Sequence, residues 1–393
     1  MEGMYTPEGE RRPQPEEIKR PKRSVFYGQN TPMDAPFAVL VTLICGIGLI
    51  MMFSSSYAWA SNSQDNPAHF LIKQGPYAVI GLIAMYLISR VNYQYLRALS
   101  IPLMLGALLL LALVPFIGTK IQGAKRWIFF GPISVQPSEI VKIAVIVLFA
   151  AMISADYKRM KTFRYGILPY AGILLVALGL LFLQPHLSAM VLIVGVSAVL
   201  LFAGGVRLWY FLLAGGVAVP AAFAILQFMP HAQDRIAVWR DPWLDPLGDG
   251  FQAIQSLLAI GSGGAFGVGL GASRQKYLYL PEPYNDFVFS IVAEELGLLG
   301  AGVVLLLFAL LILRGFWIAL KAPDRFGSLL VTGITALLGL QVFFNVAVVT
   351  GLVPVTGISM PFFSYGGSSL LIQMASMGIV LSVSRQLDVG ESV

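Results

Sequence analysis

The chain has 393 residues, of which 57% are hydrophobic and only 12% are charged. Soluble domains carry about 25% charged residues, so this composition excludes a soluble globular protein and indicates an all-α, polytopic membrane protein. The net charge of +6 is typical of basic cytoplasmic loops and gives no reason to expect a nucleic acid as partner. The single cysteine, Cys45, excludes an intramolecular disulfide.

Residues 1–34 are rich in proline and charge and have too little apolar content to fold. We interpret them as a disordered cytoplasmic tail. The apolar run that follows ends in Ala58-Trp59-Ala60, which resembles a signal-peptidase site. This run is about 20 residues long, as a bilayer span requires, whereas the apolar part of a signal peptide has about 7–15. We therefore expect an uncleaved first membrane helix.

Further apolar runs predict a bundle of about ten transmembrane helices in one membrane domain, residues 35–385, followed by a short cytoplasmic tail at 386–393. Helices are expected because unpaired backbone groups are costly in lipid, and because the chain shows no strand-like alternation. The runs after the first lie at about 74–89, 98–118, 137–154, 166–183, 188–204, 207–229, 286–314, 326–352 and 361–384.

The loop charges predict the orientation of the bundle. Lys and Arg are more frequent in the loops that lie inside when the N-terminus is cytoplasmic, as membrane proteins prefer. Both termini are then cytoplasmic, and the long loop at about 230–285, between spans seven and eight, lies outside. Half of the outer basic residues are in this loop, which indicates an anionic ligand there. They are Arg235, Arg240, Arg274 and Lys276.

The start of the fourth span carries the basic pair Lys125 and Arg126, and then Glu139 and Lys142. Glu139 lies near the positive end of the predicted helix, and Lys142, three residues later, lies on the same face. Two interpretations are open. The residues stabilise the helix start while Lys142 reaches outward, or they form an ion pair that lines a cavity, since ionisable residues in spans usually face the bundle interior.

Two further motifs have ordinary structural explanations. Gln184-Pro185-His186 predicts a short outer turn, where a single histidine is more often a turn residue than a catalyst. The glycine-rich run between Gly261 and Gly271 lacks the patterns of phosphate-binding and dinucleotide-binding loops. It predicts either a flexible hinge or close backbone packing.

Asp286 opens the eighth span, after Leu280-Pro281-Glu282-Pro283. An aspartate at the start of a helix is commonly an N-cap. At the outer membrane face it is also a candidate general base. Glu294 and Glu295 follow inside the apolar helix. Two adjacent acids there need partners, and a structural role is open to them.

Taken together, these residues resemble the SEDS family (shape, elongation, division and sporulation), which includes FtsW, RodA and SpoVE. The resemblance covers nearly the whole chain, from Pro36 to Arg385, and the segment from Gly269 to Phe287 is more similar to the FtsW and SpoVE branch than to RodA. It departs at His186, where the family often has an acid. The motifs are GAKRWI at 123–128, QPSE at 136–139, DPLGDGFQAIQSLLAIGSGG at 245–264, LPEPYNDFVFSIVAEELG at 280–297 and PFFSYGGSS at 361–369.

The resemblance implies a glycosyltransferase that polymerises lipid II into peptidoglycan strands and releases undecaprenyl diphosphate, for septal wall or spore cortex synthesis. The catalytic aspartate of the family falls on Asp286. It would take the proton from the acceptor 4-hydroxyl, which attacks the donor anomeric carbon with inversion. The candidate substrate-binding residues are Lys125, Arg126, Glu139, Lys142, Arg235, Arg240, Arg274, Lys276 and Glu282.

The implied partners are lipid II, a class B penicillin-binding protein, and proteins of the divisome or of sporulation. The implied location is the bacterial plasma membrane, at the division septum. The sequence identifies no definite cofactor. Mg²⁺ or Mn²⁺ is an open option for assisting the departing diphosphate, and no metal-ligand cluster is recognisable in the sequence. A flippase for lipid II and a scaffold that recruits a transpeptidase are the alternatives.

Overall fold

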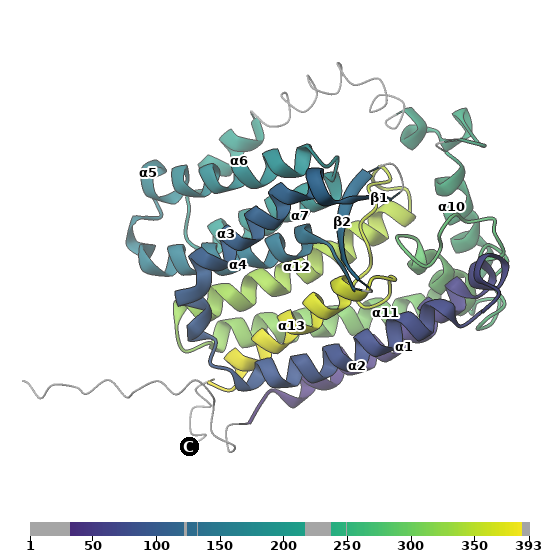
Figure 1. Cartoon of the computed structure of the whole chain (residues 1–393), viewed down its shortest axis with the longest axis horizontal. Helices are drawn as coiled ribbons and strands as arrows, with labels where there is room; N and C mark the ends of the chain where they lie inside the picture. Colours follow the sequence, from purple (N-terminus) through teal and green to yellow (C-terminus); the bar gives the residue numbers. More distant parts are fainter. Residues whose placement is uncertain (1–31, 122–123, 132, 217–236, 249, 387–393) are drawn as a thin grey trace, which may run out of the picture.

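The computed structural model describes residues 32–386 except 122–123, 132, 217–236 and 249. Its helices run side by side in one elongated bundle (Figure 1). In the described part, eight helical segments are long and apolar enough to cross a membrane. The predicted all-α membrane bundle is therefore confirmed, and the protein is a multi-pass membrane protein.

The long spans agree with the predicted apolar runs in order and in approximate position. A ninth helix, α7 (Leu187–Ala203), is shorter. The predicted span at 207–229 is helical at 208–216 and lies otherwise outside the described residues. The long spans are α1 (Ala35–Gln64), α2 (His69–Arg90), α3 (Gln94–Ile117), α4 (Pro137–Ala155), α5 with α6 (Phe163–Gly166 and Leu168–Phe182), α11 (Val288–Lys321), α12 (Arg325–Val349) and α13 (Gly367–Ser384).

Helix α1 passes through Ala58-Trp59-Ala60 without a break and ends at Gln64. Its start is fixed by Asp34, whose carboxylate accepts a hydrogen bond of 2.9 Å from the Phe37 N–H and forms an ion pair of 2.7 Å with Arg314 of α11. The predicted tails at 1–34 and 386–393 lie almost entirely outside the described residues, so the predicted limits of the membrane domain stay predictions.

A small antiparallel sheet between α3 and α4 was not predicted. Its strands are β1 (Thr119–Ile121), β2 (Ala124–Phe130) and β3 (Ile133–Val135), in the order β1-β2-β3. The expectation that the chain lacks strands is wrong here, because β3 has only three residues and an aromatic-rich β2 can also be taken for part of a loop. The sheet lies at one end of the bundle (Figure 1), where its edges need not face hydrocarbon.

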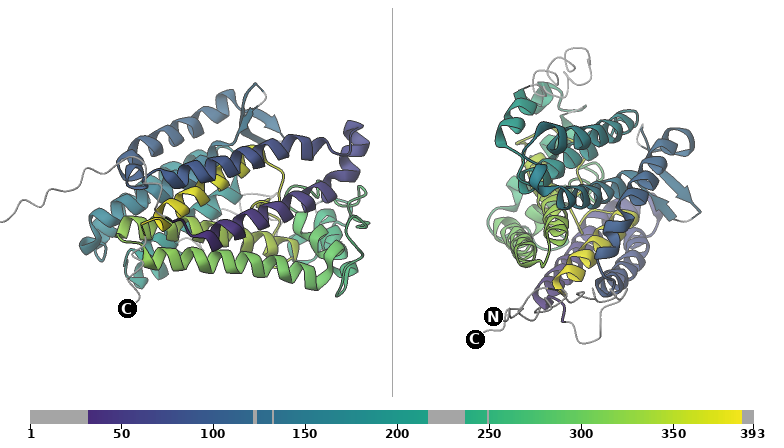
Figure 2. Two further views of the ribbon diagram at one scale, coloured as in Figure 1. Left: turned by 90° about the horizontal axis from the view of Figure 1, so that it is seen from below. Right: turned by 90° about the vertical axis from the view of Figure 1, so that its left-hand side faces the viewer.

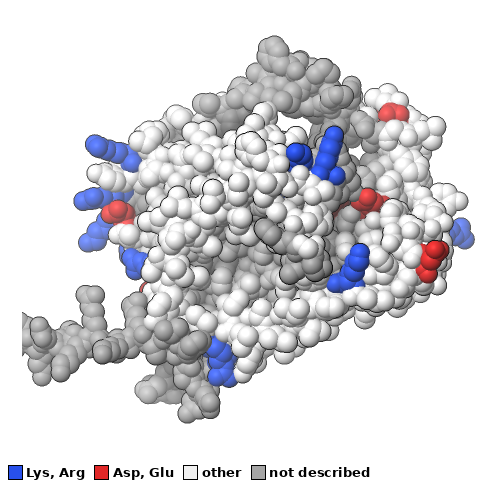
Figure 3. Space-filling model, viewed as in Figure 1, with Lys and Arg blue, Asp and Glu red and all other residues white. Residues whose placement is uncertain are grey.

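The bundle has two different ends, which Figures 1 and 2 show in three views. We call the end that carries the sheet, the segment 237–287 and the segment 350–366 the loop end, and the opposite one the basic end. Figure 3 shows Lys and Arg side chains gathered at the basic end, around α5. There the described chain also begins and ends, since the Asp34 N–H donates to Ser384 Oγ over 3.1 Å.

The segment that was predicted as a long outer loop is partly helical where the structure describes it. It contains η2 (Pro242–Leu244) and α10 (Phe251–Gly263), which the sequence analysis did not predict. Helix α10 is tied to the bundle through Ser256, whose hydroxyl lies 2.7 Å from Ser290 Oγ of α11 and donates over 2.7 Å to the Val349 carbonyl of α12.

The glycine-rich run packs its backbone directly against a break in α11. The break is at Gly297, whose φ is +67°, and the neighbouring Leu298 N–H donates over 2.9 Å to the Gly264 carbonyl. A side chain at Gly267 would place its Cβ 2.1 Å from the Glu295 carbonyl oxygen. Of the two open interpretations, close backbone packing is confirmed.

Glu294 and Glu295 are buried and bind the loop that follows α10. Glu294 accepts a hydrogen bond of 2.8 Å from the Arg274 N–H and another from the Ser273 hydroxyl. Glu295 accepts a hydrogen bond of 2.7 Å from Ser54 Oγ of α1 and pairs with Lys276 over 2.9 Å. Their role is therefore structural, as one open interpretation held.

Candidate active site

A polar cavity of about 80 Å³ lies at the loop end of the bundle. Its walls come from Trp127 of β2, from the N-terminal parts of α4, α7 and α13, from Gln341 of α12 and from the segment 357–366. Its polar lining includes the side chains of Gln136, Glu139, Lys142, His186 and Ser359.

Glu139 and Lys142 form an ion pair inside this cavity. Their charged atoms lie 2.8 Å apart, and the Lys142 side chain is only 3% exposed. Ser369 of α13 adds a hydrogen bond of 3.5 Å to the Glu139 carboxylate. The interpretation in which Lys142 reaches outward is wrong, and the ion pair that lines a cavity is confirmed. A buried ammonium group needs such a partner, because its desolvation is costly.

His186 lies in the same cavity and is 6% exposed. Its Nε2 atom lies 3.5 Å from the side-chain nitrogen of Gln136. Burial lowers the pKa of His186 to about 3, and the nearby charges of Arg126 and Lys142 act in the same direction. The imidazole is therefore neutral at physiological pH.

The two basic residues of β2 differ in their surroundings. The Arg126 guanidinium donates to the carbonyls of Pro185 and Gln184, over 2.5 and 3.5 Å, and so lies against the turn that carries His186. Lys125 is exposed and donates over 3.0 Å to the Pro115 carbonyl in α3. Arg126 is therefore bound to the turn that carries a residue of the cavity wall, whereas Lys125 is bound to α3.

Asp286 lies beside the cavity, just before α11. It is not an N-cap, since the N-cap of α11 is Phe287, which makes no side-chain capping bond. The Asp286 carboxylate instead accepts a hydrogen bond of 3.3 Å from Ser359 Oγ. Its backbone carbonyl is held by Asn345 Nδ2 of α12 over 2.7 Å. Two contacts from different segments therefore fix Asp286 against the cavity wall.

The carboxyl group of Asp286 has a raised pKa of about 6. Burial is the main cause and the charge of Glu282 adds to it, whereas the Ser359 hydrogen bond and the charge of Arg126 oppose it. A base works best when its pKa is near the working pH. The position of Asp286 therefore gives an aspartate the proton affinity that a general base needs.

An aromatic cluster holds the turn that carries Asp286. The rings of Phe70 and Tyr284 lie 4.4 Å apart, and Tyr365 packs edge-on against Phe70 while its N–H donates over 2.9 Å to the Tyr284 carbonyl. Trp59 contacts Tyr284 from α1.

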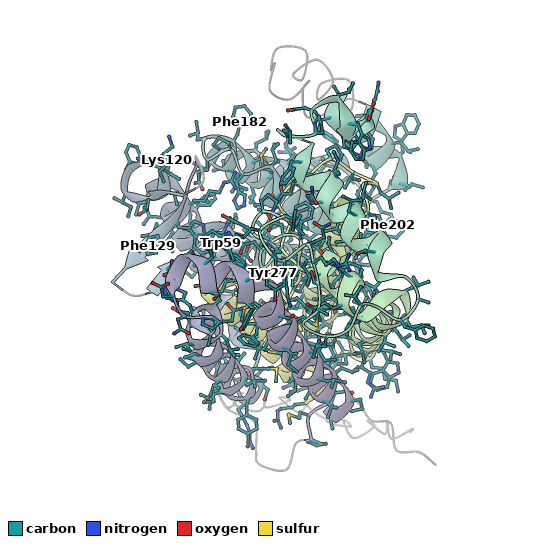
Figure 4. All side chains as sticks on the ribbon, turned by 90° about the vertical axis from the view of Figure 1, so that its right-hand side faces the viewer. Trp59, Lys120, Phe129, Phe182, Phe202 and Tyr277 are labelled. Atoms are coloured by element: carbon teal, nitrogen blue, oxygen red, sulfur yellow. The ribbon has the colours of Figure 1, made fainter. Side chains whose placement is uncertain are left out.

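Figure 4, which looks onto the loop end, shows Trp59 near the middle of the bundle and Lys120 and Phe129 at its edge, on the sheet.

The basic residues of the long loop are not gathered at this cavity. The Lys276 ammonium group is buried and donates to Glu295, Ser54 and the Gly271 carbonyl, so its protons are used within the protein. Arg274 and Arg240 are exposed, and Arg240 lines a different cavity of about 350 Å³ beside Trp239. Arg235 lies outside the described residues.

Of the predicted substrate-binding residues, the structure brings Arg126, Glu139 and Lys142 together around the cavity. Glu282 lies in the Asp286 turn and accepts a hydrogen bond of 2.8 Å from Asn285. The sequence analysis missed Ser359 as a site residue and treated His186 as a turn residue. Ser359 lies two residues before the motif PFFSYGGSS at 361–369, outside the residues that the motif singled out.

Comparison with known proteins agrees with this fold. A model of the FtsW/RodA/SpoVE family, described as cell cycle proteins, matches residues 35–389. The chain is 43% identical over 359 residues to stage V sporulation protein E of Bacillus subtilis, and the match covers 91% of this chain and 98% of that protein. It is 42% identical over 349 residues to a probable peptidoglycan glycosyltransferase FtsW of Geobacter metallireducens, with 88% and 93% covered.

Two solved structures are similar as well. One belongs to a peptidoglycan synthase complex, described as coordinating polymerization and crosslinking; it has a TM-score of 0.76 and 32% identity, and the match covers 90% of this chain and 98% of that one. The other is the rod shape determining protein RodA of Thermus thermophilus, with a TM-score of 0.67, 31% identity, and 91% and 98% covered.

Proposed function

The chain belongs to the FtsW/RodA/SpoVE family, and on that premise we propose that it is a peptidoglycan glycosyltransferase, which polymerises lipid II and releases undecaprenyl diphosphate. One observation carries the proposal: a half-buried carboxylate with a raised pKa, Asp286, lies beside a polar cavity that contains a buried Lys142. The relatives named FtsW, which carry this activity in their names, support it.

In this proposal the loop end faces the outside of the plasma membrane, and both termini are cytoplasmic. Support comes from the exposed Lys and Arg residues that gather at the basic end, since cytoplasmic loops carry such residues in excess. They include Lys158, Arg159, Lys161 and Arg164. The cavity and Asp286 would then act on lipid-linked substrate at the outer membrane surface, at the division septum or the forespore.

The reaction uses Asp286 as general base. Its carboxylate takes the proton of the acceptor 4-hydroxyl while the hydroxyl oxygen forms a bond to the donor anomeric carbon. The bond from that carbon to the diphosphate oxygen breaks with inversion, and its electron pair leaves with undecaprenyl diphosphate. The proton remains on Asp286 until solvent removes it. Ser359 orients the carboxylate by holding one of its oxygens.

Negative charge develops on the departing diphosphate, and cations in a partly dry site stabilise it. Arg126 and Lys142 are the basic residues nearest to the cavity, and they are the first candidates for this role. Lys125, Arg240 and Arg274 do not line the cavity, and Arg235 lies outside the described residues. Lys276 donates to Glu295 and Ser54 instead. Among the described residues no three metal-ligating side chains come together to hold Mg²⁺ or Mn²⁺.

The proposed partner is a class B penicillin-binding protein, which would crosslink the strands that this chain makes. Support comes from the similar structure of a peptidoglycan synthase complex, which is described as joining polymerization to crosslinking. Proteins of the divisome or of sporulation would complete the assembly. The relatives named FtsW and stage V sporulation protein E support a partner from cell division or from sporulation.

The test is polymer formation from lipid II by the purified full chain, with and without the partner protein. We expect glycan strands from the wild type and none from Asp286→Asn. Asp65→Asn is a matched control, because Asp65 is an exposed carboxylate at the end of α1, and its left-handed backbone suits asparagine. A wild type that makes no polymer but moves lipid II across vesicle membranes would contradict the proposal in favour of a flippase. Absence of both activities would favour a scaffold.

A further inference from the structure

Three helices begin at the walls of the polar cavity. Residues from the first turns or N-caps of α4, α7 and α13 line it, namely Gln136, His186 and Gly366, and all three helices start at the loop end (Figure 1). None of the three N-termini has a side-chain cap. Free N–H groups and aligned peptide dipoles make helix N-termini favourable for anions.

His186 supplies a second and independent observation. Its Nδ1 atom is buried and has no hydrogen-bond partner. The Gln136 side-chain nitrogen can only donate, so the neighbouring His186 Nε2 is the acceptor of that contact. A neutral imidazole with an accepting Nε2 carries its proton on Nδ1. His186 therefore has a buried N–H donor that lacks an acceptor, a state that costs about 1–3 kcal/mol unless a ligand oxygen satisfies it.

The charged side chains around the cavity balance one another. Lys142 is the only cation and Glu139 the only carboxylate among the described residues that line the cavity, and they pair with each other. The Arg126 guanidinium lies against the His186 turn, and Asp286 lies beside the wall at Ser359. Arg126 and Asp286 carry opposite charges, so their effects on a ligand in the cavity oppose each other. The three helix N-termini and the His186 donor then favour a negative ligand.

We propose that this cavity is an anion site for a phosphate group, in which His186 Nδ1–H donates to a phosphate oxygen next to the Lys142 ammonium group. The volume of about 80 Å³ far exceeds the roughly 10–15 Å³ that one water needs, so the cavity admits a small polyatomic group. Identifying that group as the diphosphate of the lipid-linked donor or of the product rests on the proposed function.

The test is the binding of inorganic pyrophosphate to the purified full chain in nanodiscs of zwitterionic phospholipid, followed by thermal unfolding. We expect pyrophosphate to raise the Tm of the wild type. His186→Leu removes the donor and should weaken binding about 10- to 100-fold, the effect of losing one hydrogen bond to a charged group. His186→Asn should retain binding, because its amide nitrogen lies where Nδ1 lies, whereas His186→Gln should not.

His69→Leu is the matched control, since His69 starts α2 and does not line the cavity. Its binding should equal that of the wild type. A farnesyl diphosphate arm and an anionic phospholipid arm separate the sources of the phosphate: competition by farnesyl diphosphate supports a lipid-linked diphosphate, whereas competition by phosphatidylglycerol alone would overturn that identification. Equal pyrophosphate binding by the wild type and by folded His186→Leu would overturn the site itself.

These results are separable from the proposed function. If the protein polymerises lipid II but binds pyrophosphate equally well without His186, the anion site is wrong and the proposed function stands. If pyrophosphate binding depends on His186 but the wild type makes no polymer, the anion site stands and the proposed function is wrong.

Discussion

Ser359 Oγ donates a hydrogen bond of 3.3 Å to Asp286 Oδ1, and so joins two segments that are 73 residues apart in sequence. The other carboxylate oxygen faces Gly357, where an added Cβ would lie 3.0 Å from Oδ2. One oxygen of the proposed base is therefore held by Ser359, while the other lies against a residue that has no side chain. This arrangement orients Asp286 without using up its capacity to accept a proton.

The rate of polymerisation should depend on pH through Asp286. Its pKa is raised to about 6, and the base acts only when deprotonated, so kcat/KM should fall about tenfold per unit as the pH drops below that value and should level off above it. His186 does not add to this limb, since its pKa is lowered to about 3. A pH profile of kcat/KM on lipid II checks this, and a flat profile between pH 5 and 8 would count against the base.

Two substitutions should move the midpoint of this pH profile, which reports the pKa of Asp286, in opposite directions. Ser359→Ala removes a hydrogen bond that favours the charged form, so the midpoint should rise. Glu282→Gln removes a negative charge that disfavours it, so the midpoint should fall. The pH profiles of kcat/KM for the two variants and the wild type give the direction of each shift. Shifts in the same direction would show that groups other than Asp286 control the fall in kcat/KM at low pH.

Gly357→Ala should reduce the rate more than it reduces stability. The φ of Gly357 is +72°, which strains an alanine by about 1–2 kcal/mol, and the new Cβ meets the Asp286 carboxylate. We expect a fall of at least tenfold in kcat, with a folded protein. Gly131→Ala is the control, since its φ is +62° but nothing lies within 4 Å of the added Cβ. Equal rates for the two variants would remove the steric argument.

Replacing only one member of the Glu139–Lys142 pair should destabilise the protein more than replacing both members. Lys142→Met leaves a carboxylate that is only 13% exposed without its partner, which costs about 3–5 kcal/mol in buried pairs. The double variant Glu139→Gln with Lys142→Met should recover much of the stability but not the activity. Thermal unfolding and polymerisation, measured on the two single variants and the double, test this, and a double variant with full activity would remove the pair from the site.

The sequence allowed the helices to be predicted well where apolar runs are unbroken. It placed the start of α2 too late because Lys73 interrupts the apolar pattern, although α2 begins at His69. The sheet and α10 lie at the loop end of the bundle (Figure 1), and neither has the long unbroken apolar run by which a membrane span is recognised. Hydrophobic patterns therefore describe the lipid-facing bundle better than its loop end.

The site could be predicted in part for a similar reason. Glu139 and Lys142 are three residues apart on one helix, so their pairing follows from local geometry. The partners of Lys276 do not: Glu295 and Ser54 lie 19 and 222 residues away. A basic residue in an outer loop therefore looked like a ligand contact, although tertiary structure uses it to hold the loop against α1.

The most direct measurement is kcat/KM for lipid II of Asp286→Asn against the wild type, in proteins with equal thermal stability and with the partner present. The amide keeps the size and loses the basicity of the carboxylate, so we predict a loss of about 10²- to 10⁴-fold, the usual contribution of a general base. A variant that polymerises within threefold of the wild type would contradict the assignment of Asp286 as the base.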